Sequence, residues 1–251
     1  MAAVNDNTSA AGATLHYVFD PMCGWCYAAA PLVEAVRNVP GLKVEFHGGG
    51  MMTGTNRRAI TPQWRDYVMP HDRRIAELTG QPFGEGYFDG LLRDTGAVMD
   101  SEPPTTAVLA AEALREGAGL DMIHRLQRAH YVEGRRIADA DVLGALATDL
   151  GFDADAFASA FSRLAGEATS EHIAASRRFL QRAGGQGFPT FVLAQADGTA
   201  SRIDIGPWLG RAEEWKAQLA RLVVPSPSPA TTTTTAAGAG PMSCEPDSCA
   251  A

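Results

Sequence analysis

The pattern of apolar and polar positions predicts a strand, a helix and a second strand near the start of the chain. Residues 14–19 are mainly apolar, aromatic or β-branched and end at an Asp-Pro pair, as expected of a buried strand. Apolar residues then recur at helical spacing over 24–39, where a Pro-Gly pair ends the pattern. A second strand is predicted over 42–47, and the helix before it is long enough for a parallel crossover.

The middle of the chain is predicted to be helical. Several segments between residues 51 and 183 show helical periodicity, and very little of this region has the alternation of a strand. Thr61 followed by Pro62 is a typical helix start, and Asp139 and Asp153 are placed to cap two further helices.

The strand signal returns late in the chain. Residues 190–193 and 201–205 are predicted to pair as an antiparallel hairpin across an Asp-Gly turn. Pro207 is then expected to open a final helix. The apolar face of that helix carries Trp215, Leu219 and Leu222.

Composition and charge narrow the class of protein. The chain has 251 residues, of which 45% are hydrophobic and 20% charged, so its body is expected to be globular. A formal charge of -8 lacks the basic character of a nucleic-acid binder, so no nucleic-acid partner is expected. No apolar run reaches the roughly 18 residues of a membrane span, so no membrane partner is expected. The first residues do not resemble a secretory signal, which predicts a cytoplasmic protein.

The four cysteines form two close pairs, Cys23 with Cys26 and Cys244 with Cys249. Such pairs in a cytosolic protein are typically catalytic or metal-binding. A C-x-x-C pair between a strand and its following helix places Cys23 beside unpaired N–H groups, which together with the helix dipole favour the thiolate. Cys26, one turn further on, is then placed to resolve a mixed disulfide.

The alternative for the first pair is half of a zinc site. No second closely spaced pair of cysteine or histidine in the body of the chain completes four ligands. We therefore predict a redox-active dithiol, with no metal at this site and no organic cofactor.

The motif Cys-Gly-Trp-Cys at 23–26 after a buried strand, with Gly-Phe-Pro-Thr at 187–190 before a late strand, resembles the thioredoxin superfamily. The large helical segment between them resembles the DsbA family, and its cytoplasmic FrnE-like branch most of all. The resemblance covers 13–224 in architecture, although only the two motifs are specific.

This resemblance implies an α/β thioredoxin fold with a large all-helical, DsbA-like insertion. The thioredoxin-like domain is expected over 13–50 and 184–224, with the helical insertion over 51–183. Residues 225–251 are rich in Pro, Ser, Thr, Ala and Gly, which predicts a disordered, flexible tail that carries the second cysteine pair.

The resemblance also implies how substrate is held. Pro189 is expected to follow a cis peptide bond, so that the backbone of Phe188 faces the Cys23 sulfur and can pair with an extended substrate. Trp25, Phe188 and Pro189 are therefore the candidate substrate-binding residues. Strongly oxidising relatives have His between the cysteines, whereas Trp25 supplies no positive charge, so we expect a weaker oxidant or a reductase and isomerase.

One position departs from the family pattern. Relatives often have an acidic residue six positions before the nucleophile, which relays protons to the second cysteine, and here that position is Tyr17. Water, Tyr17 itself or a carboxylate from the insertion are the alternatives for this task.

The function predicted from these residues is thiol-disulfide exchange with protein or small-molecule disulfides and thiols. Glutathione and thioredoxin are the candidate electron partners. Kappa glutathione transferases and 2-hydroxychromene-2-carboxylate isomerases resemble the chain in layout and are the alternative enzyme class. They typically have Ser in place of the nucleophile and lack the second cysteine, so Cys23 together with Cys26 argues against them.

The tail pair leaves three alternatives open. The 19 residues of segment 225–243 span roughly 24 Å as a flexible chain, which lets Cys244 and Cys249 reach Cys23. In the first alternative they form an auxiliary redox pair. A clamp for zinc or copper(I) is the second alternative and would make the chain a metal-binding or redox-sensing protein. The third is an incidental pair on a passive tail.

A group of large apolar side chains lies early in the predicted insertion. Packing in the core is the expected role of these residues, and a substrate groove is the alternative. They are Met51, Met52, Trp64, Tyr67 and Phe83.

Overall fold

The computed structural model describes residues 12–223. The predicted tail, with Cys244 and Cys249, lies outside the described residues. Within them, four strands form a mixed sheet in the order β2-β1-β5-β6, and two short strands form a second sheet. The strands are β1 (Ala13–Phe19), β2 (Leu42–Gly48), β3 (Arg58–Ala59), β4 (Val98–Met99), β5 (Thr190–Ala194) and β6 (Ala200–Ile203).

Helices make up most of the rest of the described chain. They are α1 (Gly24–Val36), α2 (Pro62–Thr79), α3 (Glu102–Leu114), α4 (Ala118–Tyr131), α5 (Ala140–Asp149), α6 (Ala154–Leu164), α7 (Glu167–Arg182) and α8 (Ala212–Leu222). Three short 3-10 turns and one π-helical turn join them. The 3-10 turns are η1 (Gly54–Asn56), η3 (Leu91–Arg93) and η4 (Gly206–Trp208), and the π turn is η2 (Gly86–Gly90).

The strand pairing agrees with the sequence prediction. β1 is parallel to β2, as a strand-helix-strand crossover requires, and β5 and β6 form the antiparallel hairpin. β5 also pairs antiparallel with β1, which places β1 at the centre of the sheet. The end of β1, where the first cysteine pair follows, is therefore held by neighbouring strands on both sides.

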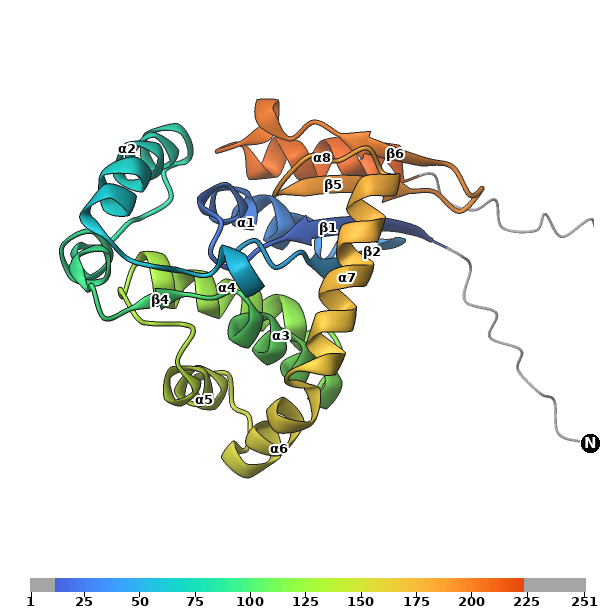
Figure 1. The fold of residues 1–251 in the computed structure, drawn as a ribbon. Helices are drawn as coiled ribbons and strands as arrows, with labels where there is room; N and C mark the ends of the chain where they lie inside the picture. Colours follow the sequence, from blue (N-terminus) through green and yellow to red (C-terminus); the bar gives the residue numbers. More distant parts are fainter. Residues whose placement is uncertain (1–11, 224–251) are drawn as a thin grey trace, which may run out of the picture.

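Helices cover both faces of the four-stranded sheet (Figure 1). Successive residues of β1 point to opposite faces, so Tyr17 contacts α1 while His16 contacts Phe179 of α7. On the Tyr17 face, α1 packs against α8, and the buried indole of Trp215 donates a hydrogen bond to Leu32 O. Helices α3–α6 gather beside the sheet, with α3 in contact with α4, α5, α6 and α7.

Local sequence signals explain where several helices begin. The Thr61 hydroxyl caps α2 by accepting a hydrogen bond from Trp64 N, and the Asp153 carboxylate caps α6 in the same way. Asp139 occupies the capping position of α5 without a side-chain hydrogen bond. These three predicted helix starts are therefore placed correctly.

Two helix boundaries predicted from the sequence are wrong. The first helix ends at Val36, because the N–H of Arg37 bonds to Glu34 O and tightens the last turn. The last helix begins only at Ala212. Pro207 lies in the separate turn η4, and the intervening Gly210 has a left-handed backbone (φ 76°) that breaks the helical path.

The predicted buried face of the last helix is only partly correct. Trp215 and Leu219 are fully buried, whereas Leu222 is 38% exposed in the final turn of α8. Among residues 12–223, none of the helices combines the length and apolarity that would let it cross a bilayer.

The packing of α8 on α1 predicts a large loss of stability for Trp215→Ala. The substitution removes a fully buried ring and its hydrogen bond, which costs about 3–5 kcal/mol of unfolding free energy. Urea denaturation measures this change. Leu222→Ala, on the same helix but exposed, is the matched control and should cost less than about 1 kcal/mol. Similar losses in both variants would contradict this account of the α1–α8 interface.

Candidate active site

Cys23 sits at the point where β1 ends and α1 begins. It is the residue that precedes the first helical turn, with an extended backbone and no capping hydrogen bond from its side chain. The N–H groups of Cys26 and Tyr27 bond back to Cys23 O at 3.0 and 3.1 Å. The sulfur of Cys23 therefore lies at the positive end of a 13-residue helix, where a thiolate is stabilised.

The two cysteines, both free thiols, have different surroundings. Cys23 keeps 7% of its surface exposed, whereas Cys26 is fully buried. Burial raises the pKa of the Cys26 thiol well above its usual range, and the adjacent Cys23 sulfur raises that pKa further. The N–H of Asp20 donates a hydrogen bond to Cys26 Sγ at 3.4 Å, which lowers the pKa of Cys26 in part. Cys26 is therefore a thiol at neutral pH.

The loop before β5 faces Cys23 from the other side. The Phe188–Pro189 peptide bond is cis, as the resemblance implies, and the Cys23 thiol donates to Phe188 O at 3.5 Å. The Phe188 ring rests against Gly49, where a Cβ atom would lie 2.1 Å from the ring. A side chain at position 49 would displace the Phe188 ring from its present position.

The Asp20 carboxylate ties together the segments that surround the dithiol. It is fully buried and accepts hydrogen bonds from Met22 N and Ser101 Oγ, each at 2.9 Å, and from Met51 N. Burial raises the pKa of Asp20, and these three hydrogen bonds lower it in part. Through them the turn before α1 is fixed to the loop after β2 and to the start of α3.

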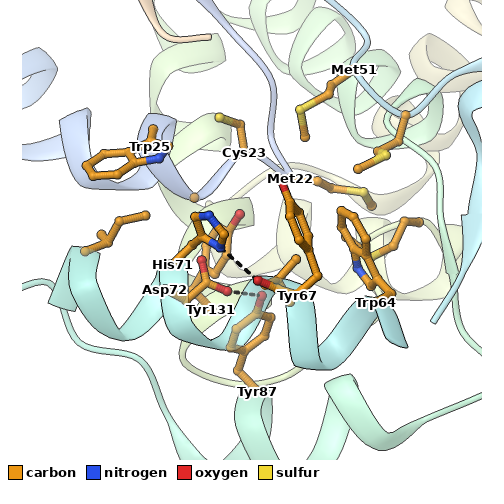
Figure 2. A pocket seen from close by; sticks show the side chains of 15 residues that line it. Met22, Cys23, Trp25, Met51, Trp64, Tyr67, His71, Asp72, Tyr87 and Tyr131 are labelled. Carbon is orange, nitrogen blue, oxygen red and sulfur yellow. Dashed lines mark hydrogen bonds between the residues drawn. The ribbon is translucent and has the colours of Figure 1, made fainter. Parts of the chain in front are cut away.

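A cavity of about 210 Å³ opens beside Cys23. Figure 2 shows Cys23 and Met51 along one side and the residues of α2 along the opposite side. The wall is mostly apolar and rich in thioethers and aromatic rings, which suits an apolar group next to a disulfide. Its residues are Met22, Cys23, Gly24, Trp25, Met51, Met52, Trp64, Tyr67, Val68, His71, Asp72, Ile75, Tyr87, Met99 and Tyr131.

The expected core role is confirmed for Met52, which is buried, and Met51, Trp64 and Phe83 are half-buried and pack against the core. It is wrong for Tyr67, which is 61% exposed. Four of these five residues also line the cavity, namely Met51, Met52, Trp64 and Tyr67. Phe83 instead packs edge-on against Tyr27, with ring centroids 5.3 Å apart. Helical periodicity shows which face of α2 points inward. It does not show that a cavity, rather than a packed helix, lies opposite that face.

Comparison with known proteins decides the family. The family model described as a DSBA-like thioredoxin domain matches residues 14–205. The chain belongs to the DsbA family. No curated protein sequence matches it significantly. The predicted fold class, a thioredoxin fold with a DsbA-like helical insertion, is confirmed, but the insertion is not all-helical, because it also contains the short strands β3 and β4. This DsbA-family protein is a thiol-disulfide oxidoreductase, as predicted.

Solved structures support the same assignment. The cytosolic disulfide reductase DsbM of Pseudomonas aeruginosa is 56% identical, with a TM-score of 0.78 over 83% of this chain and 98% of that one. Its structure with GSH gives 54% identity and a TM-score of 0.77 over the same shares. A protein of Nitrosomonas europaea, described provisionally as a protein disulfide isomerase, is 28% identical, with a TM-score of 0.68 over 84% and 97%.

The site residues predicted for this DsbA-family protein come together at one end of the sheet. Trp25 is half-buried and lines the cavity next to Cys23, and Phe188 meets Cys23 through its carbonyl. Tyr17 is buried beneath the dithiol, and its hydroxyl donates to Cys26 O at 3.3 Å.

The wall of the cavity also contains an acidic residue that was not predicted from the sequence, Asp72 of α2. Its carboxylate is almost fully buried and accepts a hydrogen bond from the Tyr87 hydroxyl at 2.8 Å. A Cβ atom on Gly24 would lie 2.7 Å from Asp72 Oδ1, so this carboxylate packs against the first residue of α1. Burial raises the pKa of Asp72 to about 6.

A signal for Asp72 is present in the sequence. Trp64, Val68 and Ile75 share one face of α2, and Asp72 falls on that face four residues after Val68. An acidic residue on the apolar face of a helix has to be buried, paired or functional.

The raised pKa of Asp72 predicts that its ionisation destabilises the folded protein. The folded-state pKa of about 6 exceeds the ordinary value of 3.8, so the cost is absent below about pH 4 and complete above about pH 6. Asp72→Asn should therefore increase the unfolding free energy by about 1–3 kcal/mol at pH 7.5 and leave it nearly unchanged at pH 4.

Urea denaturation at the two pH values measures the effect of Asp72→Asn. Asp66→Asn, exposed on the same helix, is the control and should show no such pH dependence. A variant at position 72 that is more strongly destabilised at pH 7.5 than at pH 4 would show that the ionised carboxylate is favourably paired and would contradict this account.

Proposed function

We propose that this protein is a cytoplasmic disulfide reductase in which Cys23 is the nucleophile and Cys26 the resolving thiol. The observation that carries the proposal is the asymmetry of the two sulfurs. Cys23 lies at the helix start on the wall of an open cavity, whereas Cys26 is buried behind it as a thiol. The similarity to the cytosolic reductase DsbM supports both the compartment and the direction of electron flow.

The exchange takes place in two steps. The Cys23 thiolate attacks one sulfur of the substrate disulfide and forms a mixed disulfide, and the other substrate sulfur leaves as a thiolate that takes up a proton. Cys26 then loses its proton and attacks Cys23 Sγ, which releases the second substrate thiol. The substrate gains two electrons and the protein is left with a Cys23–Cys26 disulfide.

Glutathione is the electron donor that we propose for the return to the dithiol. The thiolate of one glutathione attacks the Cys23–Cys26 disulfide, and a second glutathione releases the first as glutathione disulfide, which restores both thiols. The similar DsbM structure with GSH supports this choice over thioredoxin. The cavity next to Cys23 leaves room for a small thiol to approach the sulfur.

Backbone and apolar contacts are proposed to hold the substrate. The Phe188 carbonyl faces Cys23 and can accept a hydrogen bond from the backbone of an extended peptide. The half-buried rings of Trp25 and Trp64 offer apolar surface on the wall of the cavity. Since neither contact depends on the identity of a particular side chain, a range of disulfides would be accepted.

We propose that Tyr17 and Gln127 assist the deprotonation of Cys26. Gln127 of α4 is fully buried beside Tyr17, and its amide oxygen and nitrogen have no hydrogen-bond partner among the described residues. Both line a cavity of about 20 Å³, large enough for one water. Burial, reinforced by the sulfurs of Cys26 and Cys23, raises the pKa of Tyr17 well above its usual range, so the phenol stays protonated and can donate to a sulfur.

The roles of the two cysteines can be separated by substitution, in a Cys244→Ser/Cys249→Ser background that removes the tail thiols. Cys23→Ser should abolish glutathione-dependent reduction of insulin, because no nucleophile remains in the cavity. Cys26→Ser should accumulate a stable mixed disulfide at Cys23, which mass spectrometry detects. Full insulin reduction by Cys23→Ser would overturn the proposed function.

The proton step has its own test in Tyr17→Phe and Gln127→Met. Release of the mixed disulfide in a single turnover should slow about tenfold at pH 7, since the loss of one hydrogen bond to the reacting group costs about 1.4 kcal/mol. The difference in release rate between each variant and the parent should shrink as the pH rises, because hydroxide can then remove the Cys26 proton without help. Ile123→Val, in the same cavity wall, is the control. A reduction in release rate that does not change with pH would indicate that Tyr17 and Gln127 have a structural role only.

A further inference from the structure

Three side chains with metal-binding chemistry come together on the α7 side of the sheet. His16 on β1 lies directly across from Glu45 on β2, and His47 follows two residues further along β2. Residues two apart on a strand point to the same face, so all three side chains lie together. They face away from the side on which Tyr17 contacts α1, and nothing in the dithiol exchange uses them.

The three potential metal-ligand atoms of this group lie about as far apart as the ligand atoms of one metal ion. His16 Nδ1 lies 3.0 Å from His47 Nε2, and Glu45 Oε1 lies 3.7 Å from His47 Nε2 and 4.0 Å from His16 Nδ1. A tetrahedral ion with ligands at about 2.1 Å has ligand atoms about 3.4 Å apart. Shifts of a few tenths of an ångström would therefore place all three atoms around one ion.

Packing holds both imidazoles in place. The Phe179 ring of α7 stacks on His47 with 4.5 Å between centroids and a 5° interplanar angle, and it lies 4.8 Å from His16. The histidine side chains are only 16% and 14% exposed, whereas the Glu45 side chain is 45% exposed. Phe179 thus fixes the positions of both imidazole rings, and an ion can enter from solvent on the side of Glu45.

The charge state of the group also suits a metal. Burial lowers the pKa of His47 to about 4 and lowers that of His16, against the opposing effect of Glu45. Lys43 and His172 are the other titratable groups that act on the two rings, and both lower a histidine pKa. Neutral imidazoles keep the lone pairs that a metal needs, and the carboxylate supplies a negative charge.

We propose that His16, Glu45 and His47 bind one divalent transition-metal ion, with Zn²⁺ the best match to two imidazoles and a carboxylate. The fourth position faces solvent on the Glu45 side and takes a water. On binding, the proton shared between the two imidazoles moves to the other nitrogen of its own ring, so that both facing nitrogens can coordinate the ion. The ion then links β1 to β2 beneath α7. The site is independent of the proposed function, because it contains neither Cys23 nor Cys26.

The test uses full-length protein with all four cysteines changed to Ser, which removes every thiolate that could bind the probe. One equivalent of Co²⁺ should produce visible d–d bands without a sulfur-to-cobalt charge-transfer band, and Zn²⁺ should displace it at a 1:1 ratio. Zn²⁺ should also raise the melting temperature of this variant. No 1:1 binding of Co²⁺ or Zn²⁺ would overturn the proposal.

Substitutions in the same cysteine-free protein locate the ion. His47→Gln and Glu45→Gln should each weaken Zn²⁺ binding at least tenfold in calorimetric titration, while the exposed His124→Gln should leave it unchanged. Glu45 is exposed enough that Glu45→Gln keeps the fold, which circular dichroism checks. Equal affinity in Glu45→Gln, His47→Gln and the parent would place the ion elsewhere and overturn the assignment.

Discussion

The hydrogen bonds that the buried Asp20 carboxylate accepts are the constraint on which the rest of the site depends. They fix the turn before α1 to the loop after β2 and to the start of α3, so that the helix start and the cavity wall are built as one unit. A buried carboxylate is costly unless its oxygens are satisfied, and here three donors satisfy them. Release of any one donor would both expose that cost and let the start of α1 move relative to Met51.

The division of labour between the sulfurs follows from this placement. Because the turn carries Cys23 to the cavity edge, the next helical turn carries Cys26 into the core, where only the thiol form is stable. The same backbone therefore provides one sulfur at the edge of the cavity and one that is buried as a thiol, which is the asymmetry on which the proposed order of reaction rests. Gly49 leaves room for the Phe188 ring, while the Phe188 carbonyl accepts a hydrogen bond from the Cys23 thiol.

Features encoded over a few neighbouring residues could be predicted from the sequence. Strands, caps and the dithiol each depend on local spacing, as the hydrogen bond from Trp64 N to the Thr61 hydroxyl illustrates. Features that join distant segments could not be predicted from spacing, and the approach of Phe188 to Cys23 was expected only from the family resemblance. Asp72 reaches the start of α1 only because α2 folds back over it, and His16 meets Glu45 and His47 only through the register of β1 and β2. The left-handed Gly210 before α8 was predictable only in part. A glycine indicates a break in a helix, but the sequence alone does not show which element ends there.

Negative charge near the start of α1 bears on the direction of electron flow. The helix dipole stabilises a thiolate there, but the carboxylates of Asp20 and Asp72 both lie close to the same turn and oppose it. Trp25, between the cysteines, adds apolar surface and no compensating cation. The reduced dithiol is therefore stabilised less than in a site that has a cation at that position, and a less stable reduced form makes the disulfide a poorer oxidant. This balance is consistent with the proposed donation of electrons to substrate disulfides, and it depends on the charges around one helix terminus as well as on the two sulfurs.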